Sequence, residues 1–302
     1  MQEVTPDIAR LQVAIANVYF VGALGGPWTL VDTGVPGFAA YIKLMAEQRY
    51  GAGARPEAIV LTHGHFDHAG SALALAREWD VPIYAHPLEM PYITGKSLYP
   101  PYDPTVGGFL ANALRLIPQT YRNLSPYIRA LPEDGKVPSL PDWEWHFTPG
   151  HAPGHISLFR TSDRTLIAGD AFATVDVDNA IDFLTLKREL NRPPAPATPD
   201  YESAQASVQQ LAGLEPLTVA CGHGAATSGP DIPSQLHAFS RQTVMPEHGR
   251  YVPVPATTNE EGIVAVPPPV PDPLPRILAT VGLVALIGIG VTALFSRRRN
   301  EE

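Results

Sequence analysis

One short stretch of the chain, residues 62–68, limits its fold and chemistry more than any other. Its sequence, Thr-His-Gly-His-Phe-Asp-His, places three histidines and an aspartate close together. The apolar run at 58–61 before it is typical of a buried strand, and a helix-like run begins near Ala69. Side chains on such a strand-to-helix loop can converge on one point, and imidazole with carboxylate suits a divalent cation, above all zinc. The sequence therefore predicts a metal site at the end of this strand.

The rest of residues 1–250 alternates strand-like and helix-like runs. Strands are predicted at 11–21, 28–31, 58–61, 143–147, 156–159, 165–167 and 217–220. Helices are predicted at 38–48, 71–79 and 201–214, the last of them after Asp200 as its N-cap. This alternation indicates an α/β body.

Three further candidate ligands, His151, Asp170 and His223, follow predicted strands, and each stands beside a glycine. Loops at one edge of a sheet are where α/β folds collect functional groups. The single cysteine, Cys221, is interpreted as a buried strand residue, because free cysteine behaves as a small hydrophobe. His155 is interpreted as a packed residue, with support of the site or a substrate contact as alternatives.

Taken in order, these motifs resemble the metallo-β-lactamase superfamily. The resemblance spans roughly residues 10 to 230 and rests on Val-Asp-Thr-Gly at 31–34, the cluster at 63–68, Gly150-His151, Gly169-Asp170 and Gly222-His223. It implies an αβ/βα sandwich of two mixed sheets flanked by helices. It also implies a dinuclear metal site at one edge of the sheets.

The resemblance assigns a role to each motif residue. The side chains that it implies for the first ion are His63, His65 and His151, and those for the second are Asp67, His68 and His223. Asp170 would bridge the ions, which are expected to be two zinc ions, with iron or manganese as alternatives. Asp32 would accept a hydrogen bond that orients a ligand, or would simply close its turn.

The activity implied is that of a metal-dependent hydrolase acting on a small ester, thioester or lactone. Two ions would activate a hydroxide, and Asp67 is the expected catalytic residue, because a carboxylate beside the nucleophile can pass its proton to the leaving group. His65 favours hydrolysis, since relatives with a redox di-iron pair usually have glutamate there. Two alternatives stay open, a persulfide dioxygenase with one iron and a membrane-tethered metal-binding scaffold without catalysis.

Composition bears on the partners. Residues 85–141 contain ten prolines and five tyrosines and are predicted to be an inserted lid beside an apolar pocket for a small-molecule substrate.

The net charge is −9, and the last 27 residues contribute four arginines against two glutamates, so the body is more acidic still. Such a body repels phosphate backbones, which disfavours nucleic acid as a partner. The sequence leaves the oligomeric state open.

The C-terminal part differs from the body. Residues 251–275 are rich in proline and are predicted to form an extended stalk. Residues 277–295 carry no charge and have about the ~20-residue length that crosses a bilayer. The sequence therefore predicts a transmembrane anchor at 276–296, a basic tail at 297–302 and a single-pass membrane protein. The three arginines after the apolar run favour a cytoplasmic C-terminus, but the start of the chain shows no clear export signal, which favours a cytoplasmic body with a tail anchor. A resemblance to bacterial sorting signals would instead place the body outside.

Overall fold

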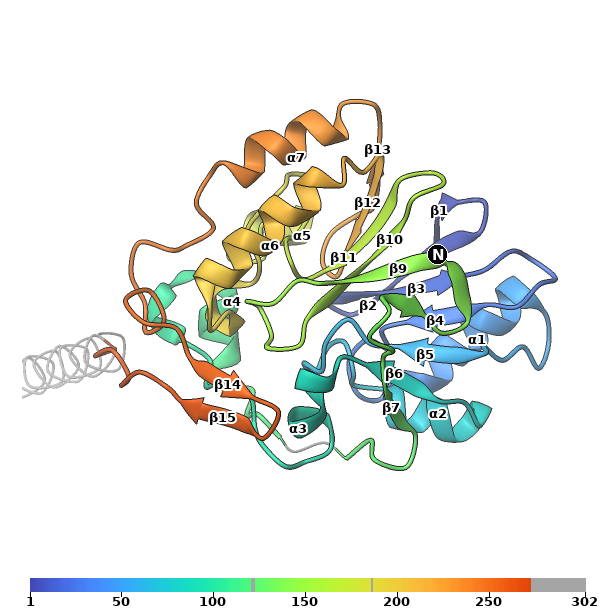
Figure 1. Cartoon of the computed structure of the whole chain (residues 1–302), viewed down its shortest axis with the longest axis horizontal. Helices are drawn as coiled ribbons and strands as arrows, with labels where there is room; N and C mark the ends of the chain where they lie inside the picture. Colours follow the sequence, from blue (N-terminus) through green and yellow to red (C-terminus); the bar gives the residue numbers. More distant parts are fainter. Residues whose placement is uncertain (121–122, 186, 273–302) are drawn as a thin grey trace, which may run out of the picture. The chain divides into compact units, whose positions relative to one another are not determined.

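The first of two mixed sheets carries the N-terminal half of the chain. In the computed structural model, which describes residues 1–120, 123–185 and 187–272, this sheet has seven strands in sequence order (Figure 1). They are β1 (Gln2–Thr5), β2 (Ile8–Val13), β3 (Ala16–Val21), β4 (Thr29–Val31), β5 (Ala58–Val60), β6 (Ile83–Ala85) and β7 (Ile128–Ala130). Strands β1 to β4 pair antiparallel, and β4 to β7 pair parallel.

The second sheet follows in the chain. Within the described residues its order is β13-β12-β11-β10-β9-β8, and only β11 and β12 pair parallel. The strands are β8 (Lys136–Val137), β9 (Leu140–Phe147), β10 (Ile156–Arg160), β11 (Thr165–Gly169), β12 (Thr218–Cys221) and β13 (Thr227–Ser228). A separate hairpin joins β14 (Thr257–Asn259) to β15 (Gly262–Ala265).

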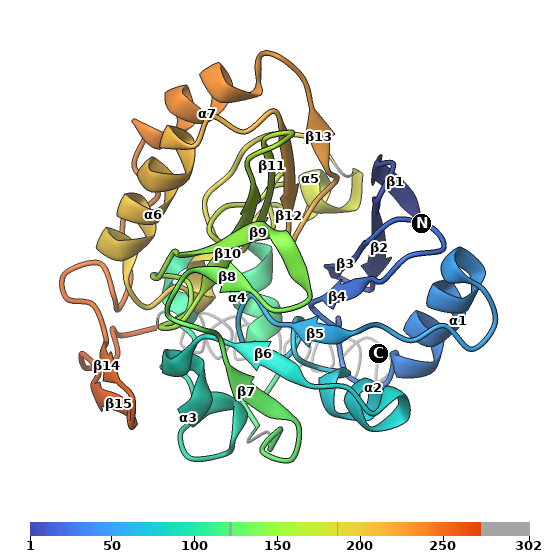
Figure 2. The ribbon, with the colours of Figure 1, turned by 45° about the vertical axis from the view of Figure 1, so that its right-hand side comes forward.

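Three apolar clusters arrange the body in layers. One lies between the sheets and combines Tyr19 and Val60 of the first with Trp143 and Leu158 of the second. Another packs the first sheet against α1 (Ala39–Tyr50) and α2 (Ala72–Trp79), and a third packs the second sheet against α6 (Tyr201–Gly213) and α7 (Ile232–Ser240). Figure 2 shows these helix pairs on opposite sides of the sheets. The body is therefore the predicted αβ/βα sandwich.

Alternation along the strands produces these layers. In β3, Val18 and Phe20 face the helices, whereas Tyr19 and Val21 face the other sheet. Because successive side chains of a strand point to opposite faces, a strand with both faces buried is apolar throughout. This explains why the inner strands read as continuous apolar runs.

The proline- and tyrosine-rich stretch, residues 85–141, contributes strands to both sheets, and its residues 86–120 form a segment that we call the added segment. Residues 128–130 and 136–137 are β7 and β8, and residues 86–120 before them form short helices. Those helices are η1 (Pro87–Glu89), α3 (Met90–Ile93), η2 (Pro104–Val106) and α4 (Gly108–Leu114), and α5 (Ala180–Thr185) and η3 (Ala195–Ala197) follow later in the chain. Within the segment expected to be a stalk, the hairpin β14–β15 contacts the added segment, since Ile263 N donates to Ser97 Oγ at 3.4 Å.

The predicted transmembrane anchor, and with it the single-pass membrane location, is corrected by the structure. No helix in the three described ranges is both long enough and apolar enough to cross a membrane. Residues 276–296, where the anchor was expected, lie outside the described residues. Residues 1–268 form one compact unit, and the fold of that unit is the sandwich without a membrane helix.

Candidate metal centre

Four strands end in polar loops that meet at one edge of the sandwich. Strands β4 and β5 are parallel, as are β11 and β12, so the carboxyl ends of each pair point the same way. Asp32 follows β4, the loop 63–68 follows β5, Asp170 follows β11 and His223 follows β12. The loop between β9 and β10 adds His151. Both sheets therefore contribute to a single site.

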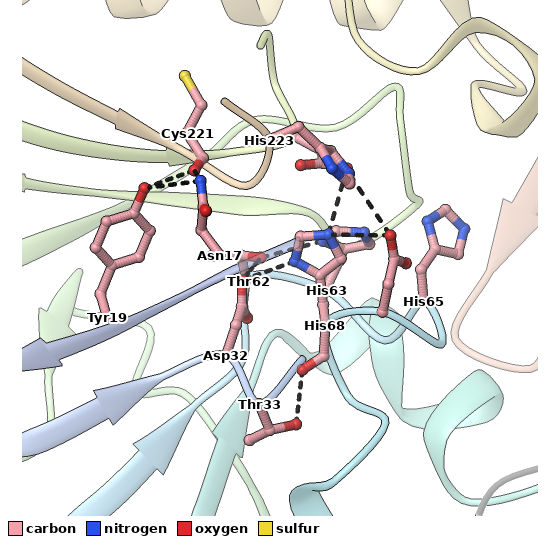
Figure 3. Close-up of polar contacts among 12 residues, drawn as sticks. Asn17, Tyr19, Asp32, Thr33, Thr62, His63, His65, His68, Cys221 and His223 are labelled. Carbon is pink, nitrogen blue, oxygen red and sulfur yellow. Dashed lines mark hydrogen bonds and ion pairs between the residues drawn. The ribbon is translucent and has the colours of Figure 1, made fainter. Parts of the chain in front are cut away.

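The seven predicted ligands come together in three overlapping groups. Within each group the potential ligand atoms lie within 4.8 Å of one another, and every member is buried. The groups are His63, His65 and His151; His63, His68 and Asp170; and Asp67, His68 and His223. The first and last have the membership that the resemblance implies for two ions. Figure 3 shows His63, His68 and His223 close together, with His65 nearby.

Asp170 lies between the two outer groups. Its Oδ2 is 3.1 Å from His223 Nε2 and 3.4 Å from His68 Nε2. The same oxygen is 3.4 Å from His151 Nε2, which belongs to the other group. A single carboxylate thus reaches members of both groups, as a bridging ligand must.

Unpaired atoms test whether the site fits a metal ion. His63 Nε2 and Asp170 Oδ1 are buried and have no hydrogen-bond partner among the described residues. Buried polar atoms are almost always paired, so two unpaired atoms in one cluster need an explanation. A cation is the partner that this set of imidazole nitrogens and carboxylate oxygens suits, and the described residues of the cluster therefore fit a divalent metal.

The electrostatics of the cluster also fit. Burial, and then the neighbouring histidines, lower the pKa of His63 and of His151 well below the ordinary value, so both rings are neutral. Burial opposes the charge on Asp170, but His223 and His68 outweigh it and hold the pKa of that carboxyl well below its ordinary value. At His68 and His223 burial is outweighed by Asp170 and its neighbouring carboxylates, which raise the pKa of both rings. Neutral imidazole and ionised carboxylate are the forms that bind metals, so His63, His151 and Asp170 already have the binding form, whereas metal binding at His68 and His223 would displace protons.

Asp32 orients the cluster from the end of β4. Its Oδ2 accepts from His68 Nδ1 at 2.8 Å, and Thr62 donates to the same carboxylate from both its backbone N (2.8 Å) and its Oγ1 (2.8 Å) (Figure 3). With the proton held on Nδ1, His68 presents Nε2 to the cluster. Asp32 also adopts φ 59°, a left-handed conformation that aspartate tolerates. Asp32 therefore holds the ring of His68 and also occupies the turn.

Other ligands are oriented in the same way. His223 Nδ1 donates to Ile15 O at 2.8 Å, which leaves Nε2 facing Asp170. His151 Nδ1 lies 3.2 Å from Thr198 Oγ1. In each case a hydrogen bond at one ring nitrogen aims the other at the cluster, an arrangement typical of metal-binding histidines.

His155 has a polar role that the packing interpretation missed. Its Nε2 accepts from the backbone N of Asp170 at 2.9 Å, and its Nδ1 lies 3.0 Å from Thr148 O. Burial lowers the pKa of His155 to about 3, so the ring is neutral and Nδ1 carries the proton that goes to Thr148. His155 thus fixes the backbone that presents Asp170.

Two polar residues of β3, which sequence reasoning also missed, hold the loop that carries His223. Asn17 Nδ2 donates to Cys221 O at 2.8 Å and to Gly224 O at 2.7 Å, and Tyr19 Oη donates to Cys221 O at 2.6 Å (Figure 3). Asn17 stands out as a buried amide in an apolar run, which is the signal that could have found it.

A buried carboxylate in the added segment joins two loops of the site. Glu89 accepts from Gly64 N at 2.8 Å and from Gly154 N at 2.7 Å, and Tyr99 Oη donates to it as well. Gly64 belongs to the first histidine loop and Gly154 to the loop of His151. A Cβ on Gly154 would lie 2.7 Å from the backbone N of Glu89, so glycine is needed for this close approach.

Cys221 takes no part in the cluster. Its side chain belongs to the apolar cluster between the second sheet and α6 and α7, and burial raises the pKa of its thiol well above the ordinary value. The interpretation as a buried strand cysteine is confirmed.

Comparisons with known proteins agree with this geometry. A family model described as the metallo-beta-lactamase superfamily matches residues 11–223. The probable metallo-hydrolase YflN of Bacillus subtilis (strain 168) is 47% identical over 237 residues, which cover 78% of this chain and 90% of that protein. A second probable metallo-hydrolase of that strain, YybB, is 31% identical over 65% of this chain and 74% of its own.

Solved structures share the fold. The BLEG-1 B3 metallo-beta-lactamase superposes with a TM-score of 0.56 at 22% identity, over 78% of this chain and 100% of that one. TTHA1623, solved in a di-iron-bound form, superposes with a TM-score of 0.51 at 26% identity, over 78% and 96% of the two chains.

Proposed function

Because the chain belongs to the metallo-beta-lactamase superfamily, we propose that it is a hydrolase of small esters, thioesters or lactones that depends on two zinc ions. The observation that carries the proposal is the meeting of seven buried donors from both sheets in three overlapping groups. The curated relatives with the name probable metallo-hydrolase support the reaction class.

The two outer groups divide the donors between two ions. His63, His65 and His151 would hold one ion, and Asp67, His68 and His223 the other, with Asp170 Oδ2 between them. When bound, the ions would supply a Lewis acid for the carbonyl oxygen and would lower the pKa of a bound water. Asp32 and His155 would keep their partners, His68 and Asp170, in place through the hydrogen bonds described above.

Asp67 is the group that we propose moves a proton. Its Oδ2 lies 3.6 Å from His223 Nε2 and 4.0 Å from His68 Nε2, and its side chain also lines the adjoining pocket. A carboxylate in this position can accept the proton of an attacking water and pass it to the leaving oxygen or sulfur. Its place between donor cluster and pocket supports this role.

Metal analysis and substrate assays of the purified full chain test the proposal. We expect two zinc ions per chain by elemental analysis and turnover of at least one member of a panel of thioesters, lactones and β-lactams. The variant Asp67→Asn should lower kcat by about 10²-fold or more, the scale of a lost acid–base group, without unfolding the protein. An empty protein, or unchanged turnover by Asp67→Asn, would contradict the proposal.

The same measurements separate the alternatives. One iron per chain together with oxidation of a persulfide would favour the dioxygenase, and bound metal without turnover of any substrate would favour a metal-binding protein without catalysis.

A further inference from the structure

The pocket beside the metal cluster has an apolar wall built by α4 and α5. Its cavity volume is about 210 Å³, and the cluster residues His65, Asp67 and His223 line it together with this wall. Ligand pockets of proteins typically measure about 300–1,000 Å³, so this cavity is somewhat smaller than most and suits a small molecule that extends to the open rim.

Helix α4 turns one continuous face to the pocket. Leu110, Ala113 and Leu114 of the helix line it at spacings of three and four residues, and Ile117 lines it from the turn after the helix. Side chains three and four residues apart lie on the same face of a helix. The body of the protein is acidic and the donor cluster is polar, whereas this face of the helix is apolar. The face therefore forms a separate apolar subsite beside the cluster.

The wall is held in place by contacts between segments that are distant in sequence. Phe109 N donates to Asp178 O at 2.7 Å, and the rings of Phe109 and Phe183 lie 6.3 Å apart between centroids. Gly108 permits this approach, because a Cβ there would lie 2.9 Å from Asp178 O, and its φ of 90° also favours glycine. α4 and α5 therefore form one side of the pocket as a unit.

The apolar surface continues to the rim. Phe109 and Ile117 line the pocket and are also 45% and 37% exposed, so they lie where it opens to solvent. Ile181 and Leu184 of α5, and Leu116 just after α4, are 71–85% exposed. Large exposed apolar groups gathered on two elements mark a binding surface rather than ordinary exposure.

Building on the proposed function, we infer that the substrate carries a medium or long apolar chain and that α4 and α5 bind this chain while the cluster receives the scissile bond. Transfer of each methylene from water to an apolar wall is worth up to about fourfold in binding. Such contact binds the ground state and transition state alike, so its effect falls on kcat/KM.

A series of acyl thioesters from acetyl to dodecanoyl tests the inference on the metal-loaded full chain. We expect kcat/KM to rise about two- to fourfold per methylene until the wall is covered, and then to level off. The variant Ala113→Phe, which puts a ring into the wall, should lower the ratio of kcat/KM for dodecanoyl to that for acetyl by about tenfold or more. Asn112→Phe, on the same helix and outside the pocket wall, should leave this ratio unchanged.

A binding measurement keeps the inference testable without turnover. Calorimetric titration with decanoate and butyrate should give decanoate the lower Kd by about tenfold or more, a difference that Ala113→Phe reduces and Asn112→Phe retains. Both ligands are carboxylates, so contact with the metal cancels in the comparison. Thermal melting verifies that each variant folds, and Ala113→Leu should give an intermediate effect.

The outcomes distinguish the inference from the function on which it rests. Hydrolysis with a flat dependence on chain length, or equal Kd values for decanoate and butyrate, would overturn the inference and leave the hydrolase proposal standing. Absence of hydrolysis with tight, chain-length-dependent binding would overturn the hydrolase proposal and support the apolar chain site.

Discussion

The carboxylate of Asp32 illustrates how much the cluster depends on side chains that bind no ion. It pairs with His68 Nδ1 and with two donors of Thr62, and it is 1% exposed. Loss of such an outer hydrogen-bond partner typically costs 10- to 100-fold in metal affinity.

We therefore expect Asp32→Asn to weaken zinc binding by about 10- to 100-fold, measured by competition with a chromogenic chelator. The amide removes one acceptor oxygen while keeping a residue that tolerates the φ of 59°. Asp80→Asn is a matched control, because Asp80 has φ 52°, is exposed and lies at the C-terminal end of α2, outside the donor cluster. Equal zinc affinity of the two variants would rule out the orienting role of Asp32.

The candidate ligands and one support, Asp32, were named from the sequence, but the other supports were not. The spacing of the 63–68 cluster predicts its chemistry because four donors occur within one loop. Asn17 instead acts on Cys221 O, 204 residues away, and Glu89 acts on Gly64 and Gly154 from a segment expected only to wall the pocket. Such partners are set by the packing of distant segments, which local sequence patterns do not report.

At the scale of elements, the added segment is coupled to the metal loops through Glu89. The side chain is fully buried, and it accepts from backbone donors in two different loops. Tyr99 adds a third donor, and its ring centroid lies 4.5 Å from that of His65. The hydrogen bonds of Glu89 thus fix the short helices of the added segment beside the donor cluster.

Removing this link should cost stability. We expect Glu89→Ala to lower the free energy of unfolding by about 2–4 kcal/mol, because it removes the acceptor of Gly154 N and of the Tyr99 hydroxyl and leaves Gly64 N with only the Tyr99 oxygen. Tyr99→Phe, which removes one hydroxyl and keeps the ring, should cost about 1 kcal/mol. Urea denaturation measures both, with the exposed Glu57→Gln as control. A loss for Glu89→Ala no larger than that for Glu57→Gln would show that the link carries no stability.

Strand prediction succeeded where both faces are buried and failed at turns and edges. The apolar run predicted as one strand over 11–21 is two strands, β2 and β3, joined at Ala14 with φ 55°. Alanine gives no turn signal, since glycine, asparagine and aspartate usually mark such conformations. The edge strands β1, β7, β8 and β13 were missed, and so was the three-residue inner strand β6, because such short strands have little apolar pattern.

At the scale of the whole molecule, the donor cluster connects the two sheets. His63 and His68 come from the first sheet, whereas His151, Asp170 and His223 come from the second. Bound metal would therefore stabilise the sandwich as well as the site. A ligand present at 100 to 1,000 times its Kd stabilises the folded state by about 3–4 kcal/mol.

We expect chelation to lower the Tm measurably, and zinc to restore it. For a protein of this length, about 3 kcal/mol corresponds to roughly 6–12 °C. Differential scanning calorimetry with and without a chelator measures the shift, and His63→Ala, which removes a shared donor, should show a smaller shift than the parent chain. If the chelator changed the Tm of neither the parent chain nor His63→Ala, metal binding by the folded protein would be contradicted.

The sheets also meet through an ion pair away from the metal cluster. Asp7, in the turn between β1 and β2, binds the guanidinium of Arg160 at the end of β10, which also pairs with Asp163 and lies 5.0 Å over the ring of Trp143. Hydrogen bonds from Arg160, which outweigh burial, lower the pKa of Asp7 below its ordinary value. Because the folded-state pKa is the lower one, the ion pair stabilises the protein above the unfolded-state pKa of about 4, and this contribution is lost as the pH falls through the folded-state value.

The variant Asp7→Asn should consequently lose at most about 1 kcal/mol at neutral pH, since the pair is partly exposed and screened by solvent. The deficit should shrink as the pH falls below about 4, where the parent carboxylate itself becomes protonated. Urea denaturation at several pH values measures the difference between the two chains, and the exposed Asp142→Asn serves as control. A deficit that stayed constant down to acid pH would mean that Asp7 acts through its shape or its neutral hydrogen bonds, and that its charge contributes nothing to holding the two sheets together.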